Sequence, residues 1–150
     1  MEQLTAAQMQ HLQRRVKERM AVEDRGYTTP CWISNRVAQP NGYTKMACLG
    51  KVALTHRVAY RAFTGPIPDG LVIDHLCRQR ACCNPDHLDA VTNQVNLLRG
   101  EGFVAQQVLR THCPRDHALV GDNIYRRPGH DNKRECRTCR NDYYRRRKAG

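Results

Sequence analysis

The chain has 150 residues, the length of one ordinary domain. Hydrophobic residues are 40% of it but include only two Phe and one Trp, so we expect a modest apolar core. A net charge of +11, from 25 Lys and Arg against 14 Asp and Glu, favours a polyanionic partner. Nothing resembles a basic membrane-binding helix, so nucleic acid is the preferred partner and a merely solvated basic surface the alternative. The start MEQLTAAQMQHLQRRVKERM resembles neither a signal peptide nor a membrane span. We therefore expect a cytoplasmic, reducing environment, in which the eight Cys favour metal ligation over disulfides.

The first half of the chain predicts a helix, a hairpin and a second helix. Apolar residues recur at helical spacing from Leu4, and Gly26 follows as a stop, which predicts a helix over 4–23. Residues 27–51 are rich in β-formers and hold Pro40-Asn41-Gly42 between two runs, which predicts a hairpin. Residues 55–63 predict a short helix that begins at Thr55.

The second half predicts two strands, a loop between them and a helix. The apolar run 71–73 is typical of a strand that leads into Asp74 and His75. Residues 88–91 favour a second strand, and Thr92 is a suitable N-cap for a helix over 93–99. Residues 101–112 indicate a helix or a linker, and the tail NDYYRRRKAG a basic, helical end.

The stretch VIDHLCRQRACCNPDHL, residues 72–88, indicates a metal site. Cys77, Cys82 and His87 are spaced by four intervening residues each time, which supplies three ligands for a tetrahedral zinc ion. The fourth ligand is Cys31, Cys48 or Cys83. Cys83 is adjacent to Cys82, so its side chain is expected to point away from that of Cys82. Buried free thiols with a capping histidine are the alternative, but the loop offers few apolar neighbours for them. Such a closed site predicts a structural zinc that stabilises the loop.

A second group of ligands follows near the C-terminus. Cys113 and His117 form a CxxxH pair, and Cys136 and Cys139 form a CxxC pair eighteen residues later. This spacing is typical of a zinc-ribbon site, whereas a redox dithiol would need neither Cys113 nor His117. His130, in the turn-rich segment between the pairs, is expected to be an exposed loop histidine.

The C-terminal segment is strongly basic. Residues 133–148 contain eight Lys or Arg against two acids, with Tyr143 and Tyr144 between them. Basic side chains in this zinc-held segment predict salt-dependent and mostly sequence-independent binding to phosphates. The candidate DNA contacts are Arg137, Arg140, Arg145, Arg146, Arg147 and Lys148.

One histidine of residues 72–88 is left over for chemistry. His75 stands directly after Asp74, at the end of the predicted strand, and a structural hydrogen bond is the simplest role for it. Three features favour a catalytic role: Asp74 offers a hard oxygen ligand for Mg²⁺, Asn96 lies on the following helix, and the protein is basic.

These residues resemble the HNH endonucleases of the His-Me finger (ββα-metal) superfamily, especially the zinc-braced phage and intron-encoded homing type. The resemblance rests on DHLCRQRACCNPDHL followed by VTNQVNLLRG, with CW, HRVAY and GPIPDGLVIDHLC before them and THCPRDH and CRTC after them, over about residues 31–140. It implies an α+β fold: a small zinc-stabilised ββα-metal core with a short hairpin and helices, plus a C-terminal zinc-ribbon-like module. We accordingly expect an N-terminal helix in 1–26, the nuclease core in 27–100 and a zinc-binding basic module in 101–150.

The resemblance also assigns roles to single residues. It implies that His75 is the general base, that Asn96 binds the catalytic metal in place of the motif's final His, and that Asn84 holds the loop. Asp74 matches an acidic residue that binds the metal in several branches, whereas other zinc-braced members have Ser there. Cys31, in a Cys-Trp pair, matches the upstream zinc ligand. The alternative is that Cys48 is the zinc ligand in place of Cys31. The cysteines that bind no zinc, Cys83 among them, are then expected to be packing residues.

The implied activity is metal-dependent hydrolysis of DNA phosphodiester bonds, as nicking or double-strand cleavage. A neutral His75 would accept a proton from water, held in one tautomer by a backbone carbonyl of the zinc loop. The cofactors are two structural Zn²⁺ and a catalytic Mg²⁺ or Mn²⁺ bound by Asn96 and Asp74. Arg57 and His56 are candidates for phosphate contacts, with a plain surface role as the alternative for Arg57.

The expected partner is double-stranded DNA, with no membrane and no small-molecule substrate. The sequence does not decide between a monomer and a homodimer. Two other classes compete with the nuclease. A non-catalytic zinc-finger DNA-binding protein explains the charge and both Cys/His groups, and an interaction module with scaffolding zinc sites explains the ligands alone. Neither requires Asp74, His75 and Asn96 at the family's spacing.

Overall fold

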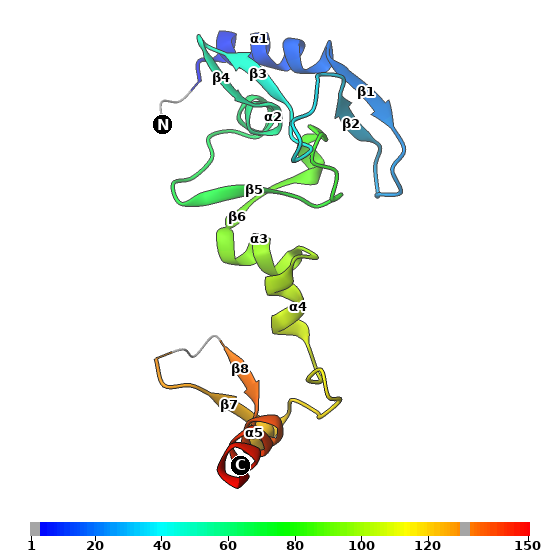
Figure 1. Ribbon diagram of the computed structural model, residues 1–150. Coiled ribbons are helices and arrows are strands. Elements are labelled where there is room, and N and C mark those ends of the chain that lie inside the picture. Colours follow the sequence, from blue (N-terminus) through cyan, green and yellow to red (C-terminus); the bar gives the residue numbers. More distant parts are fainter. Residues whose placement is uncertain (1–3, 130–132) are drawn as a thin grey trace. The chain divides into compact units, whose positions relative to one another are not determined.

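The computed structural model describes residues 4–129 and 133–150, so His130 lies outside the described residues. The chain divides into two compact units, Met1–Asn96 (unit 1) and Leu97–Gly150 (unit 2). Short helices and two-stranded antiparallel sheets make up the described parts of both units (Figure 1). The fold is therefore small and α+β, as predicted.

Unit 1 begins with helix α1 (Ala6–Lys17), capped by a reciprocal pair of hydrogen bonds between Thr5 and Gln8. The predicted helix over 4–23 is wrong in its last part, because Met20–Glu23 form strand β1, which pairs with β2 (Cys31–Ser34). Met20 continues the helical spacing of α1 in the sequence. Its pairing with Ser34, far along the chain, overrides that local preference.

The second hairpin of unit 1 has a different turn from the predicted one. Strand β3 (Lys45–Cys48) pairs with β4 (Lys51–Leu54), and the connection is Leu49-Gly50, both with positive φ. Two such residues form the tight turn whose twist matches that of the strands. Pro40-Asn41-Gly42 instead lies in the connection between β2 and β3, which do not pair with each other.

Helix α2 (Thr55–Phe63) follows β4 and begins at Thr55 as predicted. Its buried residues Val58, Ala59 and Ala62 pack with Leu12 and Val16 of α1 in the core of unit 1. Gln13 of α1 also donates a hydrogen bond to the Ala62 carbonyl, at 2.7 Å. The N-terminal helix is thus part of the same hydrophobic core as α2.

The hairpin that carries Asp74 and His75 is built from β5 (Leu71–His75) and β6 (Leu88–Thr92). The two strands pair antiparallel, with His75 opposite Leu88. Between them lie the cysteine-rich loop and a single 3-10 turn, η1 (Pro85–His87). Helix α3 (Asn93–Arg99) begins directly after β6, with Thr92 accepting a hydrogen bond from the Val95 backbone N–H as the predicted N-cap.

Unit 2 contains helix α4 (Phe103–Leu109), the turn η2 (Gly121–Asn123), the hairpin β7 (Ile124–Arg126) with β8 (Arg134–Cys136), and helix α5 (Arg137–Ala149). Its small core contains Cys113, Leu119 and Cys136. Arg134 donates to the carbonyls of Gln107, Val108 and Arg110 at the end of α4, which fixes the hairpin to that helix. None of the described helices has the length and hydropathy needed to span a membrane.

Candidate metal centres and catalytic loop

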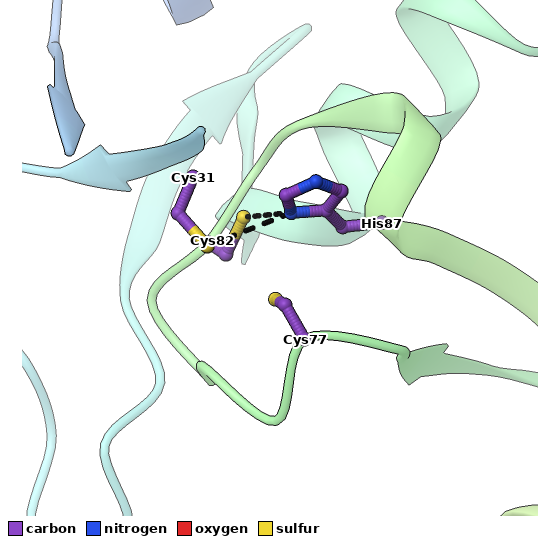
Figure 2. A group of neighbouring side chains, drawn as sticks. All are labelled: Cys31, Cys77, Cys82 and His87. Carbon is purple, nitrogen blue, oxygen red and sulfur yellow. Dashed lines mark hydrogen bonds between the residues drawn. The ribbon is translucent and has the colours of Figure 1, made fainter. Parts of the chain in front are cut away.

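The first predicted ligand group comes together in unit 1. The ligand atoms of Cys31, Cys77, Cys82 and His87 lie within 4.8 Å of one another, and all four residues are buried. The Cys31 and Cys82 sulfurs each lie 3.5 Å from Nδ1 of His87. The ligands of one tetrahedral zinc ion lie about 3.3–3.8 Å apart, so the group fits such an ion. Figure 2 shows the four side chains pointing toward one another from β2, the cysteine-rich loop and η1.

This geometry distinguishes between the three cysteines that the sequence left open. Cys31 joins the group, whereas Cys48 and Cys83 lie in the hydrophobic core of unit 1. Burial raises the pKa of the Cys83 thiol, and the neighbouring Cys82 raises it further, as befits a packing residue. The sulfur of Cys83 lies 3.7 Å from the Ala81 carbonyl.

His87 is oriented for metal ligation through Nδ1. Its Nε2 lies 2.7 Å from the Thr29 hydroxyl, and the ring of Tyr27 contacts the imidazole edge-on. Burial lowers the pKa of His87, which favours the neutral form that a metal requires. A Thr29 hydroxyl that accepts from Nε2 leaves the lone pair of Nδ1 directed at the sulfurs, the usual arrangement of an oriented histidine ligand.

Two further contacts hold the loop around this group. Asn84 is buried; its side-chain amide donates to the Pro30 carbonyl at 2.9 Å, and its oxygen accepts from the Asp86 backbone N–H. Pro30 immediately precedes Cys31, so Asn84 links η1 to the strand that carries the fourth ligand. This is the loop-holding role expected of Asn84.

The second predicted ligand group comes together in unit 2. The ligand atoms of Cys113, His117, Cys136 and Cys139 lie within 4.8 Å of one another, with His117 and Cys139 only half-buried. Burial raises the pKa of Cys113, but hydrogen bonds from the backbone of His117 and Arg115 and from side chains outweigh it and lower that pKa to about 6. A thiolate is the form that binds zinc, so this shift favours the ligand form of Cys113.

His75 lies at the end of β5 and is only 5% exposed. Its Nε2 lies 3.2 Å from the backbone carbonyl oxygen of Cys82. A carbonyl only accepts, so Nε2 carries the proton and Nδ1 keeps a lone pair. Burial lowers the pKa of His75 to about 4, although the Cys82 hydrogen bond and the charge of Asp74 raise it. The lowered pKa favours a neutral imidazole, and a carbonyl of the cysteine-rich loop holds it in one tautomer.

Two rings that the sequence analysis left out of this arrangement lie against His75. His56 of α2 contacts it edge-on, with the ring centroids 4.6 Å apart, and Tyr43 packs against both histidines. His56 is as buried as His75 and Asp74, so it forms a wall of the site beside them. Burial lowers the pKa of His56 to about 3, and its Nδ1 has no hydrogen-bond partner among the described residues.

Asp74 precedes His75 and is also buried, at 3% exposure. Its Oδ1 accepts from the guanidinium of Arg78 at 2.8 Å, and the same guanidinium donates to the His75 carbonyl at 3.2 Å. The Arg78 guanidinium therefore pairs with the same carboxylate that the sequence predicts as a ligand of the divalent metal. This donor chemistry fits Mg²⁺ or Mn²⁺.

The other candidate residues lie on three helices. Asn96 is half-exposed on α3 and Arg57 is half-buried on α2. On α5, Arg140 is half-buried between two tyrosine rings, while the remaining candidates are exposed: Arg137, Arg145, Arg146, Arg147 and Lys148.

Comparison with known proteins finds one matching family model. The sequence model of the HNH endonuclease family matches residues 53–98, a segment that contains His75, Asn84 and Asn96. It also contains three ligands of the first group, whereas Cys31 and the second group lie outside it. No solved structure matches the chain.

Three curated phage proteins are similar to parts of the chain. The uncharacterized gene 5.3 protein of Enterobacteria phage T3 is 41% identical over 44 residues, which are 29% of this chain and 44% of that protein. Protein 2.8 of Escherichia phage T7 is 33% identical over 87 residues, 57% of this chain and 56% of that protein. Protein 7.7 of the same phage is 36% identical over 55 residues, 37% of this chain and 42% of that protein. The matches thus span about half the length of these relatives.

Residues 53–98 form an HNH endonuclease domain by their family match, in a chain with phage homologues. The two ligand groups described above, called the first and second tetrads below, are consistent with zinc sites.

Proposed function

We propose that this protein is a zinc-braced endonuclease that hydrolyses DNA phosphodiester bonds with a divalent cation, Mg²⁺ or Mn²⁺. The observation that carries the proposal is the single tautomer of His75, whose Nε2–H donates to a carbonyl of the loop that the first tetrad holds. A regulator that only binds DNA has no need for a neutral, oriented imidazole at this point of the HNH domain.

His75 is the general base in this proposal. Its Nδ1 lone pair accepts a proton from the attacking water, and the Cys82 carbonyl keeps the other nitrogen protonated. The lowered pKa keeps the ring neutral at physiological pH. His56 and Tyr43 pack against the ring and restrict its rotation.

Asp74 and Asn96 are the proposed ligands of the catalytic cation. Mg²⁺ keeps several of its waters and takes phosphate oxygens, so one or two protein ligands are sufficient. When bound with DNA, the cation supplies neutralisation of the phosphate and of the leaving 3′ oxygen. Arg57, on the helix that packs beside the site, is the proposed phosphate contact.

The two tetrads are proposed to hold structural zinc ions. Each offers four Cys or His ligands and therefore leaves no open coordination position for chemistry. The exposed basic residues of α5 would contact DNA phosphates and add affinity with little sequence preference. Because its relatives are phage proteins, we place the reaction inside an infected bacterial cell, with homing of the gene as a narrower form of the same proposal.

The test is cleavage of supercoiled plasmid by the zinc-loaded protein with Mg²⁺, compared with the variant His75→Ala. Loss of a general base is expected to lower the nicking rate by about 10²–10⁴-fold. Zinc content by mass spectrometry and DNA binding by mobility shift with Ca²⁺ should not change. His11→Ala, which removes an exposed histidine of α1, is the matched control and should cleave like the parent protein.

Two results would contradict the proposal. Full nicking by His75→Ala would exclude His75 as the base. Tight DNA binding without Mg²⁺-dependent cleavage by the parent protein would instead identify a non-catalytic zinc-finger protein.

A further inference from the structure

Unit 2 carries a groove of about 420 Å³ beside its Cys/His tetrad. Cysteines of the tetrad form part of its wall, and the rest includes tyrosine rings and arginines, with Glu135 as the acid among the lining residues. Its lining includes the arginines Arg110, Arg127 and Arg140 and the tyrosines Tyr143 and Tyr144. The candidate HNH residues lie in unit 1, so this groove is a separate site.

Arg140 is a fixed part of the groove wall. Its guanidinium lies over the ring of Tyr125, 3.8 Å from the centroid, and 5.2 Å from the centroid of Tyr144. It also donates to the carboxylate of Glu135 at 3.0 Å. Three partners restrain this side chain, so Arg140 positions the Tyr144 ring and has little freedom to contact a phosphate.

The tyrosine rings remain accessible although they are held in place. Tyr143 and Tyr144 are 58% and 45% exposed, and their rings meet edge-on with centroids 5.4 Å apart. Neither tyrosine belongs to the small core of unit 2, which is built around the tetrad. Their exposed faces are therefore available to a flat ligand.

The groove also offers positive charge for an anion. Arg127 lines it and is half-exposed, with Glu135 3.8 Å away as a loose partner. Arg110 lines the groove too. The guanidinium groups of both arginines are suited to charge-assisted hydrogen bonds with phosphate oxygens.

A ligand with flat aromatic rings and regularly spaced negative charges fits both features, and a nucleic-acid strand has this composition. In a duplex the base faces are covered by their neighbours, so only unpaired bases can stack on a protein ring. We propose that the groove binds an unpaired stretch of DNA strand, with its bases on Tyr143 and Tyr144 and its phosphates near Arg110 and Arg127. This deepens the proposed function and rests on it for the identity of the nucleic acid, because a DNA nuclease meets unpaired strand at frayed ends.

The test separates stacking on bases from attraction to phosphates. Fluorescence anisotropy of the zinc-loaded full chain, without Mg²⁺, compares a labelled oligothymidine, an abasic strand of the same length and a duplex. We expect the parent protein to bind oligothymidine on the order of tenfold tighter than the abasic strand. Equal affinity for these two strands would overturn the proposal without any variant that must fold.

Paired variants then locate the contact. Tyr143→Leu with Tyr144→Leu removes both rings and should weaken oligothymidine binding on the order of tenfold while leaving the abasic strand unaffected. Tyr143→Phe with Tyr144→Phe keeps the rings and should bind like the parent protein. A similar loss on the abasic strand, or the same loss in the Phe pair, would contradict stacking. His75→Ala should bind the strand normally, so a failure of this proposal and a failure of plasmid cleavage are separate results.

Discussion

The Asp74–Arg78 pair shows how one residue can control a neighbouring metal ligand. Arg78 has φ of 57°, a left-handed conformation that costs a non-glycine residue about 1–3 kcal/mol. In this conformation its backbone N–H donates to the His75 carbonyl at 3.0 Å, and its side chain folds back to Asp74. The guanidinium thus neutralises a buried carboxylate that would otherwise be costly to keep charged. A divalent cation at Asp74 has to compete with it.

The competition gives a prediction for Arg78→Ala. Without the guanidinium, Asp74 should bind Mn²⁺ about fivefold more tightly in the absence of DNA, the equivalent of roughly 1 kcal/mol for a half-exposed ion pair. Electron paramagnetic resonance of free Mn²⁺ measures this affinity directly. The matched control is Arg80→Ala, which removes an equal charge from the same loop but a side chain that donates to Asn41. Equal changes in both variants would mean that net charge, and not the ion pair, sets the affinity.

For single residues, the sequence predicted the metal ligands better than the side chains around them. The spacing and the family resemblance were sufficient to find both tetrads, because short loops between ligands constrain them locally. The carbonyl acceptor for His75 was also predicted, and it is the Cys82 carbonyl. His56 and Tyr43 were not placed against His75, because that contact joins three segments distant in sequence and depends on how α2 packs.

Among the elements, those with strong local signals were predicted and those defined by long-range pairing were not. Helices α2 and α3 and strands β5 and β6 begin within a residue of their predicted positions, since a cap or an apolar run marks each one. Strand β1 was predicted as helix, because only its pairing with β2 makes it a strand. The Leu49-Gly50 turn was missed in favour of Pro40-Asn41-Gly42, which carries the stronger turn composition but connects unpaired strands.

Helix α3 carries Asn96, a proposed ligand of the catalytic cation. It has no buried residues, so its first turn depends on the Thr92 hydroxyl, which accepts from the Val95 N–H at 3.2 Å. Thr92→Ala should destabilise the start of the helix by about 1 kcal/mol. If Asn96 binds the catalytic cation, half-maximal nicking should then require several-fold more Mg²⁺.

Thr92→Ser keeps a capping hydroxyl and should retain the parent's Mg²⁺ requirement. Hydrogen exchange of the α3 amides reports the fraying separately from activity. Frayed α3 amides together with an unchanged Mg²⁺ requirement would remove Asn96 from the metal site.

For the whole molecule, the two tetrads lie in two units of very different construction. Unit 1 has a hydrophobic core that α1, α2 and the hairpins share, and its tetrad lies beside that core. Unit 2 buries little beyond the tetrad cysteines and Leu119. Zinc binding contributes on the order of 10 kcal/mol to folding in small zinc domains, so unit 2 should depend on its metal far more than unit 1.

This difference predicts that a chelator will release the zinc in two phases. His117 and Cys139 of the second tetrad are half-buried, whereas all four ligands of the first are buried, so the second ion should leave first. The fast phase should be accompanied by loss of the β7–β8 hairpin while the amides of α2 stay protected, because the core of unit 1 does not include the second tetrad. A colorimetric zinc indicator with parallel hydrogen exchange measures both events.

Cys139→Ser should abolish only the fast phase and Cys82→Ser only the slow one. A single phase, or a fast phase that survives in Cys139→Ser, would show that the two sites do not differ in the way their burial implies.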